Sequence, residues 1–220
     1  MSKSVVFILV QCIAFVCSAS NLPGAITGVV LDIKGRPFAG ATVTVESVGD
    51  RIEMAAELTT ETDSDGKFEL KNLELISYRV FAAKEEIGYP SPRFAVYNSN
   101  DSVATVTLTS ESPNAYVVLK MAPKAAVLEG TLKDVLTGEV LKGALVMERV
   151  GMPQSQMGTS IGSNFKILVP ADADVLLEVR VPGYATWYFP GTATISKRKP
   201  LRLKSGAVLQ IPVSIQRVTQ

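Results

Sequence analysis

The chain has 220 residues, of which 47% are hydrophobic, so it is long and apolar enough for one large β domain or two domains of ordinary size. Lysine and arginine together number 22 against 21 acidic residues, and this near-neutral balance argues against nucleic-acid binding. The sequence contains no histidine, which removes the usual zinc, serine and cysteine hydrolase sites. We therefore predict a protein that is not an enzyme, with no catalytic residues, no bound metal and no cofactor. A hydrolase that uses lysine or carboxylate groups stays open as a third alternative.

Residues 1–19 have the pattern of a secretory signal peptide. Lys3 precedes an apolar run over residues 5–16, and Cys17-Ser18-Ala19 supplies the small residues of a cleavage site after Ala19. A membrane anchor is the alternative interpretation, although the run is shorter than the ~20 residues that a spanning helix needs. Cleavage removes both cysteines, so we predict a mature chain that is secreted or periplasmic, has no membrane span and forms no disulfide.

Residues 25–121 contain several segments in which apolar and polar side chains alternate with a period of two. This period is typical of β-strands that place one face on a core. Turns rich in glycine and proline, such as Lys34-Gly35-Arg36-Pro37, separate the segments. We expect strands at residues 25–32, 41–47, 59–62, 67–71, 77–83, 103–109 and 115–121. Residues 50–57 are predicted as a loop, and residues 84–101 as a long connection of the kind that is often functional.

The clearest turn is Asp63-Ser64-Asp65-Gly66, which stands between a threonine-rich strand and an alternating strand. An Asp-Gly step between two such strands predicts a β-hairpin, because glycine accepts a positive φ. Asp63, Asp65 and Glu69 also have the spacing of part of a calcium loop, but the full ligand set is missing. We favour a turn whose aspartate side chains bond to their own backbone.

The pattern starts again in the second half of the chain. Gly28 and Gly130 are 102 residues apart, and Asp32 and Asp134 have the same separation, which indicates an internal duplication. We expect strands of the second copy at residues 127–134, 144–150, 164–169, 175–181 and 208–218. The predicted domains are therefore residues 20–121 and 126–220. Residues 122–125 form a short linker that leaves the two domains little hinge freedom.

Two motifs of the first copy are Gly28-x-x-x-Asp32-x-x-Gly35-x-Pro37-x-x-Gly40-Ala41 and Thr62-Asp63-x-Asp65-Gly66-x-Phe68. Both resemble the carboxypeptidase regulatory-like domain family. The second copy looks like a divergent member, with Gly162-Ser163-Asn164 in place of the Asp-x-Asp-Gly turn. The resemblance implies a seven-stranded transthyretin-like, or prealbumin-like, β-sandwich for each copy. It also implies a non-catalytic accessory module of the kind that often occurs on exported proteins.

Aromatic side chains supply two candidate ligand surfaces. The candidate residues are Tyr184, Trp187 and Tyr188 in one cluster and Tyr89 and Tyr97 in the long connection. Flat aromatic faces can stack on a sugar ring or a peptide, but amphipathic rings also cover the end of a core. We favour the structural role for Tyr184 and Trp187, and keep ligand binding by all five as the alternative.

Together these features predict an all-β protein with two tandem seven-stranded transthyretin-like, or Ig-like, β-sandwich domains after a signal peptide. The expected function is a secreted, non-catalytic module for binding an extracellular or cell-surface protein, or for structural support. An open edge strand is the expected route of protein binding, because such an edge presents unpaired backbone groups. A carbohydrate-binding module with an aromatic platform is the alternative, with a glycan as its partner.

Overall fold

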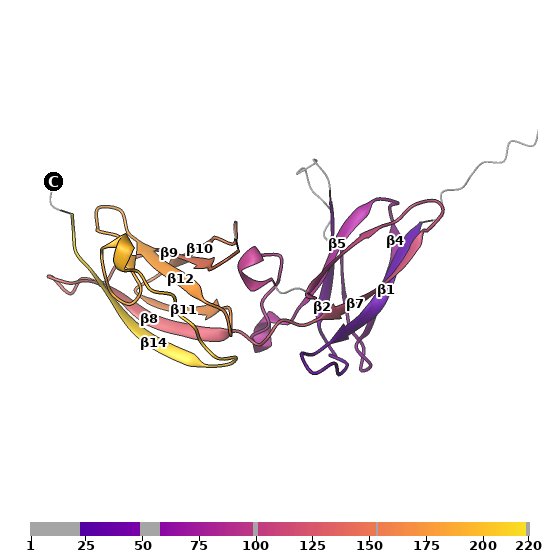
Figure 1. Cartoon of the computed structure of the whole chain (residues 1–220), viewed down its shortest axis with the longest axis horizontal. Coiled ribbons are helices and arrows are strands. Elements are labelled where there is room, and N and C mark those ends of the chain that lie inside the picture. The colour runs from indigo at the N-terminus through magenta and orange to yellow at the C-terminus, as the bar shows by residue number, and fades with distance from the viewer. Residues whose placement is uncertain (1–22, 49–57, 99–100, 153, 219–220) are drawn as a thin grey trace, which may run out of the picture.

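The computed structural model describes residues 23–48, 58–98, 101–152 and 154–218. The predicted signal peptide and the predicted loop at 50–57 lie outside these residues. The described chain forms two β-sandwich units that follow one another along an elongated molecule (Figure 1). We call the part from β1 to β7 unit 1 and the part from β8 to β14 unit 2.

Unit 1 contains two sheets with seven strands. The strands are β1 (Gly24–Leu31), β2 (Thr42–Ser47), β3 (Leu58–Glu61), β4 (Lys67–Leu73), β5 (Ser77–Ala83), β6 (Val103–Thr107) and β7 (Asn114–Lys120). The sheets have the orders β4-β1-β7 and β3-β2-β5-β6. All neighbours are antiparallel except β1 and β7, which are parallel. Two short 3-10 helices, η1 (Glu85–Ile87) and η2 (Ala95–Tyr97), lie between β5 and β6.

Unit 2 repeats this architecture strand for strand. The strands are β8 (Ala126–Asp134), β9 (Gly143–Arg149), β10 (Met157–Ile161), β11 (Asn164–Val169), β12 (Val175–Arg180), β13 (Trp187–Tyr188) and β14 (Val208–Ile215), with η3 (Ile195–Lys197) before β14. The sheets are β11-β8-β14 and β10-β9-β12-β13, and β8 and β14 are again parallel. The predicted fold class, two tandem seven-stranded sandwiches, is therefore confirmed. The strands β10 and β13 were not in the set that the sequence predicts.

The core of each sandwich forms from the inward positions of alternating strands. In β1 the buried residues Ile26, Gly28 and Val30 alternate with half-buried ones, as a strand with one face on a core requires. Gly28 pairs with Phe68 across β1 and β4. A side chain added at Gly28 would collide with the Phe68 ring and with the carbonyl oxygen of Val117. The glycine thus leaves room for the aromatic ring in the core.

Unit 2 has the same glycine and aromatic pair. Gly130 pairs with Phe165 across β8 and β11, and an added side chain would meet the Phe165 ring and the carbonyl oxygen of Ile211. The turns after β1 and β8 also match. Asp32 Oδ1 accepts the backbone N–H of Arg36, and Asp134 Oδ1 accepts that of Thr137. These backbone hydrogen bonds are the main reason why the pKa of both aspartates is lowered.

The predicted hairpin at the Asp-Gly turn is wrong. The turn itself forms, since Asp63 N–H donates to the Lys67 carbonyl oxygen at 2.9 Å and Gly66 N–H donates to that of Asp63 at 3.0 Å. However, β3 pairs with β2 and β4 pairs with β1, so the turn carries the chain from one sheet to the other. Thr62 still exchanges backbone hydrogen bonds with Gly40 and Ala41, and its hydroxyl donates to the Phe38 carbonyl oxygen at 2.7 Å, so the chain leaves the four-stranded sheet only after Thr62.

Candidate functional site

The most distinctive feature of the molecule is the connection between β5 and β6. Its described residues 84–98, which we call the insert, have no counterpart in unit 2, where only residues 181–186 connect β12 and β13. The insert begins as a closed loop, because Lys84 and Tyr89 exchange two backbone hydrogen bonds of 2.9 and 3.0 Å. In Figure 1 the insert and its two short helices lie between the units.

The first part of the insert packs on unit 1. The half-buried Tyr89 ring meets Phe38 edge to face, with 5.1 Å between the ring centroids. Farther along, Arg93 Nε lies 2.8 Å from Glu46 Oε1, on a face of β2 that points away from the unit 1 core. In β5, Val80 and Ala82 belong to the unit 1 core, so the side chain of Phe81 between them points to the same outer face. Phe81 is nevertheless only 2% exposed. We infer that the insert covers this face of the four-stranded sheet.

The end of the insert lies inside unit 2. Val96 is fully buried and Tyr97 is 7% exposed, and both belong to the hydrophobic core that β8 to β14 form. The Tyr97 hydroxyl donates to the carbonyl oxygen of Leu168 in β11 at 2.9 Å and also approaches Met147 Sδ at 4.0 Å. Burial, with a smaller contribution from the negative charge of Glu85, raises the pKa of Tyr97 to about 12.

Polar contacts surround this apolar contact. The Arg149 guanidinium of β9 donates to the Asn98 carbonyl oxygen at the end of the insert. Ala125 N–H, just before β8, donates to the Gly88 carbonyl oxygen at 2.8 Å. The Ser205 hydroxyl of unit 2 donates to the Lys124 carbonyl oxygen at 2.9 Å. The joint thus consists of residues from the insert, the linker and both sheets of unit 2, and a pocket of about 150 Å³ lies beside Tyr97 and Arg149.

The predicted aromatic cluster of unit 2 is largely structural. Trp187 is 6% exposed, belongs to the unit 2 core and packs edge to face on Phe189. Arg217 lies 5.4 Å from the centre of the Tyr184 ring and donates to its hydroxyl at 3.1 Å, so one face of that ring is covered. Tyr188 is half-buried beside a void of only about 10 Å³, which has room for no more than one water molecule. No broad aromatic platform results.

The five predicted ligand-binding residues do not share one surface. Tyr89 packs on unit 1, Tyr97 lies in the joint, and Tyr184, Trp187 and Tyr188 lie on unit 2. With 7% and 6% exposure, Tyr97 and Trp187 have no free ring face on which a sugar could stack. The geometry therefore gives the carbohydrate alternative no support.

The turn that resembles part of a calcium loop has its acidic groups in other contacts. Asp63 Oδ1 accepts the backbone N–H of Asp65 at 2.9 Å and that of Lys67 at 2.8 Å. Asp65 pairs with Lys67 at 3.2 Å, and Glu69 pairs with Lys71 at 2.9 Å. The aspartate turn that we favoured is thus confirmed. Within the described residues, no three His, Cys, Asp or Glu side chains gather as metal ligands would.

Comparison with known proteins gives a family match for the first unit. Residues 25–111 match the family model of the carboxypeptidase regulatory-like domain. Unit 1 is thus similar to carboxypeptidase regulatory-like domains. The resemblance read from the sequence is confirmed for this unit. The match does not extend to unit 2, whose place in the family stays a prediction that its repeated strand order supports.

Solved structures with some likeness to the chain have low scores. The TIE protein of Bacillus anthracis is 18% identical with a TM-score of 0.34, and the alignment covers 90% of this chain and 34% of that one. The shaft pilin SpaA of Lactobacillus rhamnosus GG is 11% identical, with a TM-score of 0.34 and coverage of 90% and 100%. The minor pilin GBS52 of Streptococcus agalactiae is 15% identical, with a TM-score of 0.39 and coverage of 90% and 97%. Likenesses of this size assign no function to the chain.

No curated protein matches the sequence at a significant level. In the part of the chain that the structure describes, no helix has the length and apolar character needed to cross a membrane. The present chain spans about one third of the length of the TIE protein.

Sequence reasoning did not detect the joint. It identified the connection at 84–101 as long and gave Tyr97 a role at the surface. The available signal was the pair Val96-Tyr97, two apolar side chains within a polar, proline-bearing stretch. Such a pair indicates a buried contact, but it does not say which unit supplies the surrounding core.

Proposed function

We propose that the chain is a non-catalytic extracellular module in which two β-sandwiches are locked into one rigid body. Its role is structural support that holds protein-binding surfaces at a fixed separation. The observation that carries this proposal is the position of Val96 and Tyr97, which leave unit 1 and are buried in the core of unit 2. The predicted signal peptide at residues 1–19 supports an extracellular place of action.

The joint is stable enough to suppress hinge motion. Burying one side chain of the size of Val or Tyr stabilises a protein by about 1.5–3 kcal/mol. To open the joint, the chain must expose both side chains and break the hydrogen bond from Tyr97 to the Leu168 carbonyl oxygen. A combined cost of about 4 kcal/mol keeps the open state near one molecule in a thousand, since each 1.4 kcal/mol is a factor of ten.

The chemistry of the joint also supports a role without catalysis. A strongly shifted pKa often marks a catalytic group, but structural burial shifts pKa values as well. Tyr97, with its pKa raised to about 12, is 7% exposed and lies in the hydrophobic core of unit 2. The raised pKa of Tyr97 is therefore explained by its packing. The absence of histidine from the sequence removes the most common acid and base of enzymes.

Nuclear magnetic resonance tests the proposal through residual dipolar couplings. We expect the couplings of both units in residues 20–220 to fit a single alignment tensor, because a rigid body aligns as one object. Val96→Asp places a charge in the unit 2 core, so we expect two tensors and loss of amide protection in unit 2. Ala95→Asp is the matched control, because Ala95 is the exposed neighbour in the same helix η2. Two independent tensors in the unmodified protein would refute the rigid body.

A further inference from the structure

The outer edge of β7 has backbone groups that pair with no other strand. Ala25 N–H donates to the Pro113 carbonyl oxygen at 3.0 Å, and Met121 N–H donates to that of Leu31 at 2.8 Å. In a parallel ladder, alternate residues of a strand bond to the same neighbour. The odd-numbered residues of β7 therefore face β1, and the backbone groups of the even-numbered residues point to the opposite side.

No described strand lies hydrogen-bonded on that opposite side, because β7 is the last strand of its sheet. Lys120 N–H at one end is used by the Asp101 carbonyl oxygen at 2.9 Å. The N–H and C=O groups of Asn114, Tyr116 and Val118 remain available along the edge. The side chains there are open as well, since Tyr116 is 67% and Val118 is 51% exposed.

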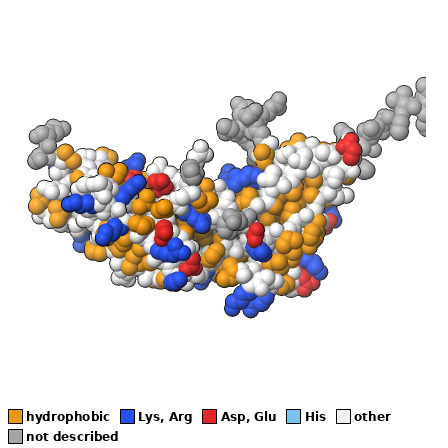
Figure 2. Space-filling view, in the orientation of Figure 1, with side chains coloured by type: hydrophobic (Ala, Val, Ile, Leu, Met, Phe, Trp, Pro, Cys, Tyr) orange, Lys and Arg blue, Asp and Glu red, His pale blue; other side chains and the backbone are white. Residues whose placement is uncertain are grey.

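The sheet face beside this edge is apolar near β7 and charged near β4. The register places Val118 next to Val29, which is next to Lys67, and Tyr116 next to Thr27. Figure 2 shows hydrophobic side chains gathered over the part of unit 1 where β1 lies. A strand added at β7 would extend this face, and its alternate side chains would lie beside Tyr116 and Val118.

The corresponding edge of unit 2 is blocked. Val127 N–H donates to the Ala207 carbonyl oxygen and Val135 N–H to that of Ile215, both within 2.9 Å, so the even-numbered residues of β14 face outward. Pro212 is one of these residues and has no N–H to donate. It is the structural counterpart of Val118, because Pro212 pairs with Thr131 as Val118 pairs with Val29. Proline on an edge strand is a known protection against unwanted pairing.

We propose that the β7 edge binds an extended strand of a partner protein by β-augmentation, with apolar or β-branched residues at alternate positions of that strand. Backbone groups at three alternating residues provide the hydrogen bonds, and the ring of Tyr116 with the side chain of Val118 selects the alternate side chains. This proposal names a binding surface for the module described above. It does not require the joint to be rigid, since β7 and its neighbour β1 contain no residue of the insert.

A partner strand fits this edge better than a second copy of the chain does. The open edge runs only from Asn114 to Val118, between Pro113 and the contact of Lys120 with Asp101. An interface limited to so short an edge falls below the ~1,200 Å² of a stable dimer and within the size range of weak, transient complexes, such as one with a single partner strand. The edge side chains Asn114, Tyr116 and Val118 are uncharged, which suits an apolar segment without a charge pattern of its own.

A displayed random heptapeptide library tests the proposal, with immobilised residues 20–220 as the target. We expect enriched peptides with alternating β-branched or aromatic residues, and slower amide exchange at Tyr116 and Val118 when they bind. Val118→Pro installs the residue that unit 2 has at this position, and we expect at least a tenfold loss of peptide affinity. Val118→Thr, which keeps the N–H and the β-branch, is the matched control and should retain affinity within threefold.

Several outcomes would overturn the proposal. These are failure to enrich alternating peptides, equal affinity for Val118→Pro, and amide protection outside β7. Concentration-dependent dimerisation in sedimentation, lost in Val118→Pro, would assign the edge to a second copy and would also overturn it. If Val118→Pro does not fold, amide exchange on the unmodified protein still decides the question. Because Val118→Pro leaves the insert unchanged, its dipolar couplings should still fit one tensor, so the edge and the joint are tested separately.

Discussion

The two units share their interior and differ at their borders. Both have the same seven-strand order, the same glycine and phenylalanine pair and the same aspartate turn after the first strand. Unit 1 alone has the insert, and its last strand carries Val118 where unit 2 carries Pro212. The shared residues explain why each half folds. The residues that differ explain how the halves are joined and which edge is left open.

The largest loss of stability should come from substitutions in the interior that the two units share. Gly28→Ala and Gly130→Ala each place a Cβ against a backbone carbonyl oxygen and a buried aromatic ring. We expect each change to lower the free energy of unfolding by about 3 kcal/mol, because overpacking of a tight core costs about 1–3 kcal/mol and a backbone clash is not relieved by a rotamer change. Chemical denaturation checks this expectation.

Gly158→Ala is the matched control for these glycines. Gly158 also lies within a strand, but the nearest atom to an added Cβ is Val146 Cγ2 at 3.9 Å, so alanine fits without a clash. We expect a change within about 1 kcal/mol, since alanine is entropically favoured over glycine in a strand. Equal costs at Gly28 and Gly158 would show that the clash with the Val117 carbonyl oxygen is relieved elsewhere.

These shared features are also the part of the fold that the sequence made predictable. Spacing alone related Gly28 to Gly130 and Asp32 to Asp134, and the strand expected at residues 208–218 is β14. The sequence failed where a tertiary contact decides the result. The Asp63 turn looks the same in the sequence whether its two strands pair or pass to different sheets, because their actual partners, β2 and β1, lie earlier in the chain and not beside the turn.

The candidate site was less predictable than the fold for the same reason. Tyr97 lies in a stretch of polar residues and prolines, and this composition predicts a surface position. Its burial depends on a core that β8 to β14 supply later in the chain. Likewise, Val118 and Pro212 differ visibly in the sequence, but only the register of β7 and β14 shows that they are equivalent edge positions.

A second effect, of intermediate size, should come from the joint at alkaline pH. The pKa of Tyr97 is raised from 10.0 to about 12, so the folded protein favours the neutral phenol. The stabilisation that this raised pKa provides is fully present below pH 10. It is lost as the pH rises from 10 to 12, at up to about 1.4 kcal/mol per pH unit. We expect unmodified protein to lose about 2–3 kcal/mol more than Tyr97→Phe over this interval, measured by denaturation at each pH.

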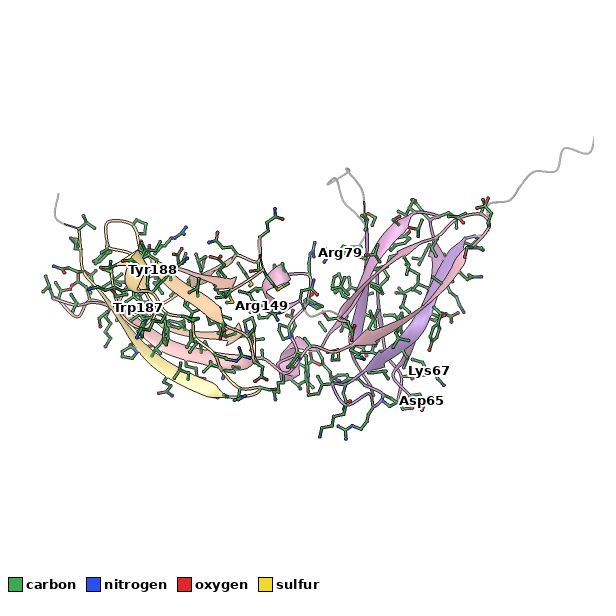
Figure 3. All side chains as sticks on the ribbon, in the orientation of Figure 1. Asp65, Lys67, Arg79, Arg149, Trp187 and Tyr188 are labelled. Atoms are coloured by element: carbon green, nitrogen blue, oxygen red, sulfur yellow. The ribbon has the colours of Figure 1, made fainter. Side chains whose placement is uncertain are left out.

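Tyr116→Phe is the control for the alkaline experiment, because it removes a phenol from a ring that is 67% exposed. The free energy of unfolding of Tyr116→Phe should change with pH as that of the unmodified protein does, because both contain the same lysines and the same other tyrosines. Parallel curves for the unmodified protein and Tyr97→Phe would mean that the phenol of Tyr97 reaches water. The joint, in which Arg149 (Figure 3) also takes part, would then open more readily than its hydrogen bonds suggest.

The smallest effect on stability, and the sharpest test of the comparison, should come from Pro212→Val. Pro212 is exposed and its missing N–H points away from β8, so we expect the free energy of unfolding to change by less than about 1 kcal/mol. The change gives β14 the open edge that β7 has, and the alternating heptapeptides should then also slow amide exchange at Gln210. If they bind only at β7, the proline is not what separates the two edges. The discrimination would then lie with Tyr116, whose counterpart in unit 2 is Gln210, and side-chain contact would outweigh backbone pairing in choosing the partner.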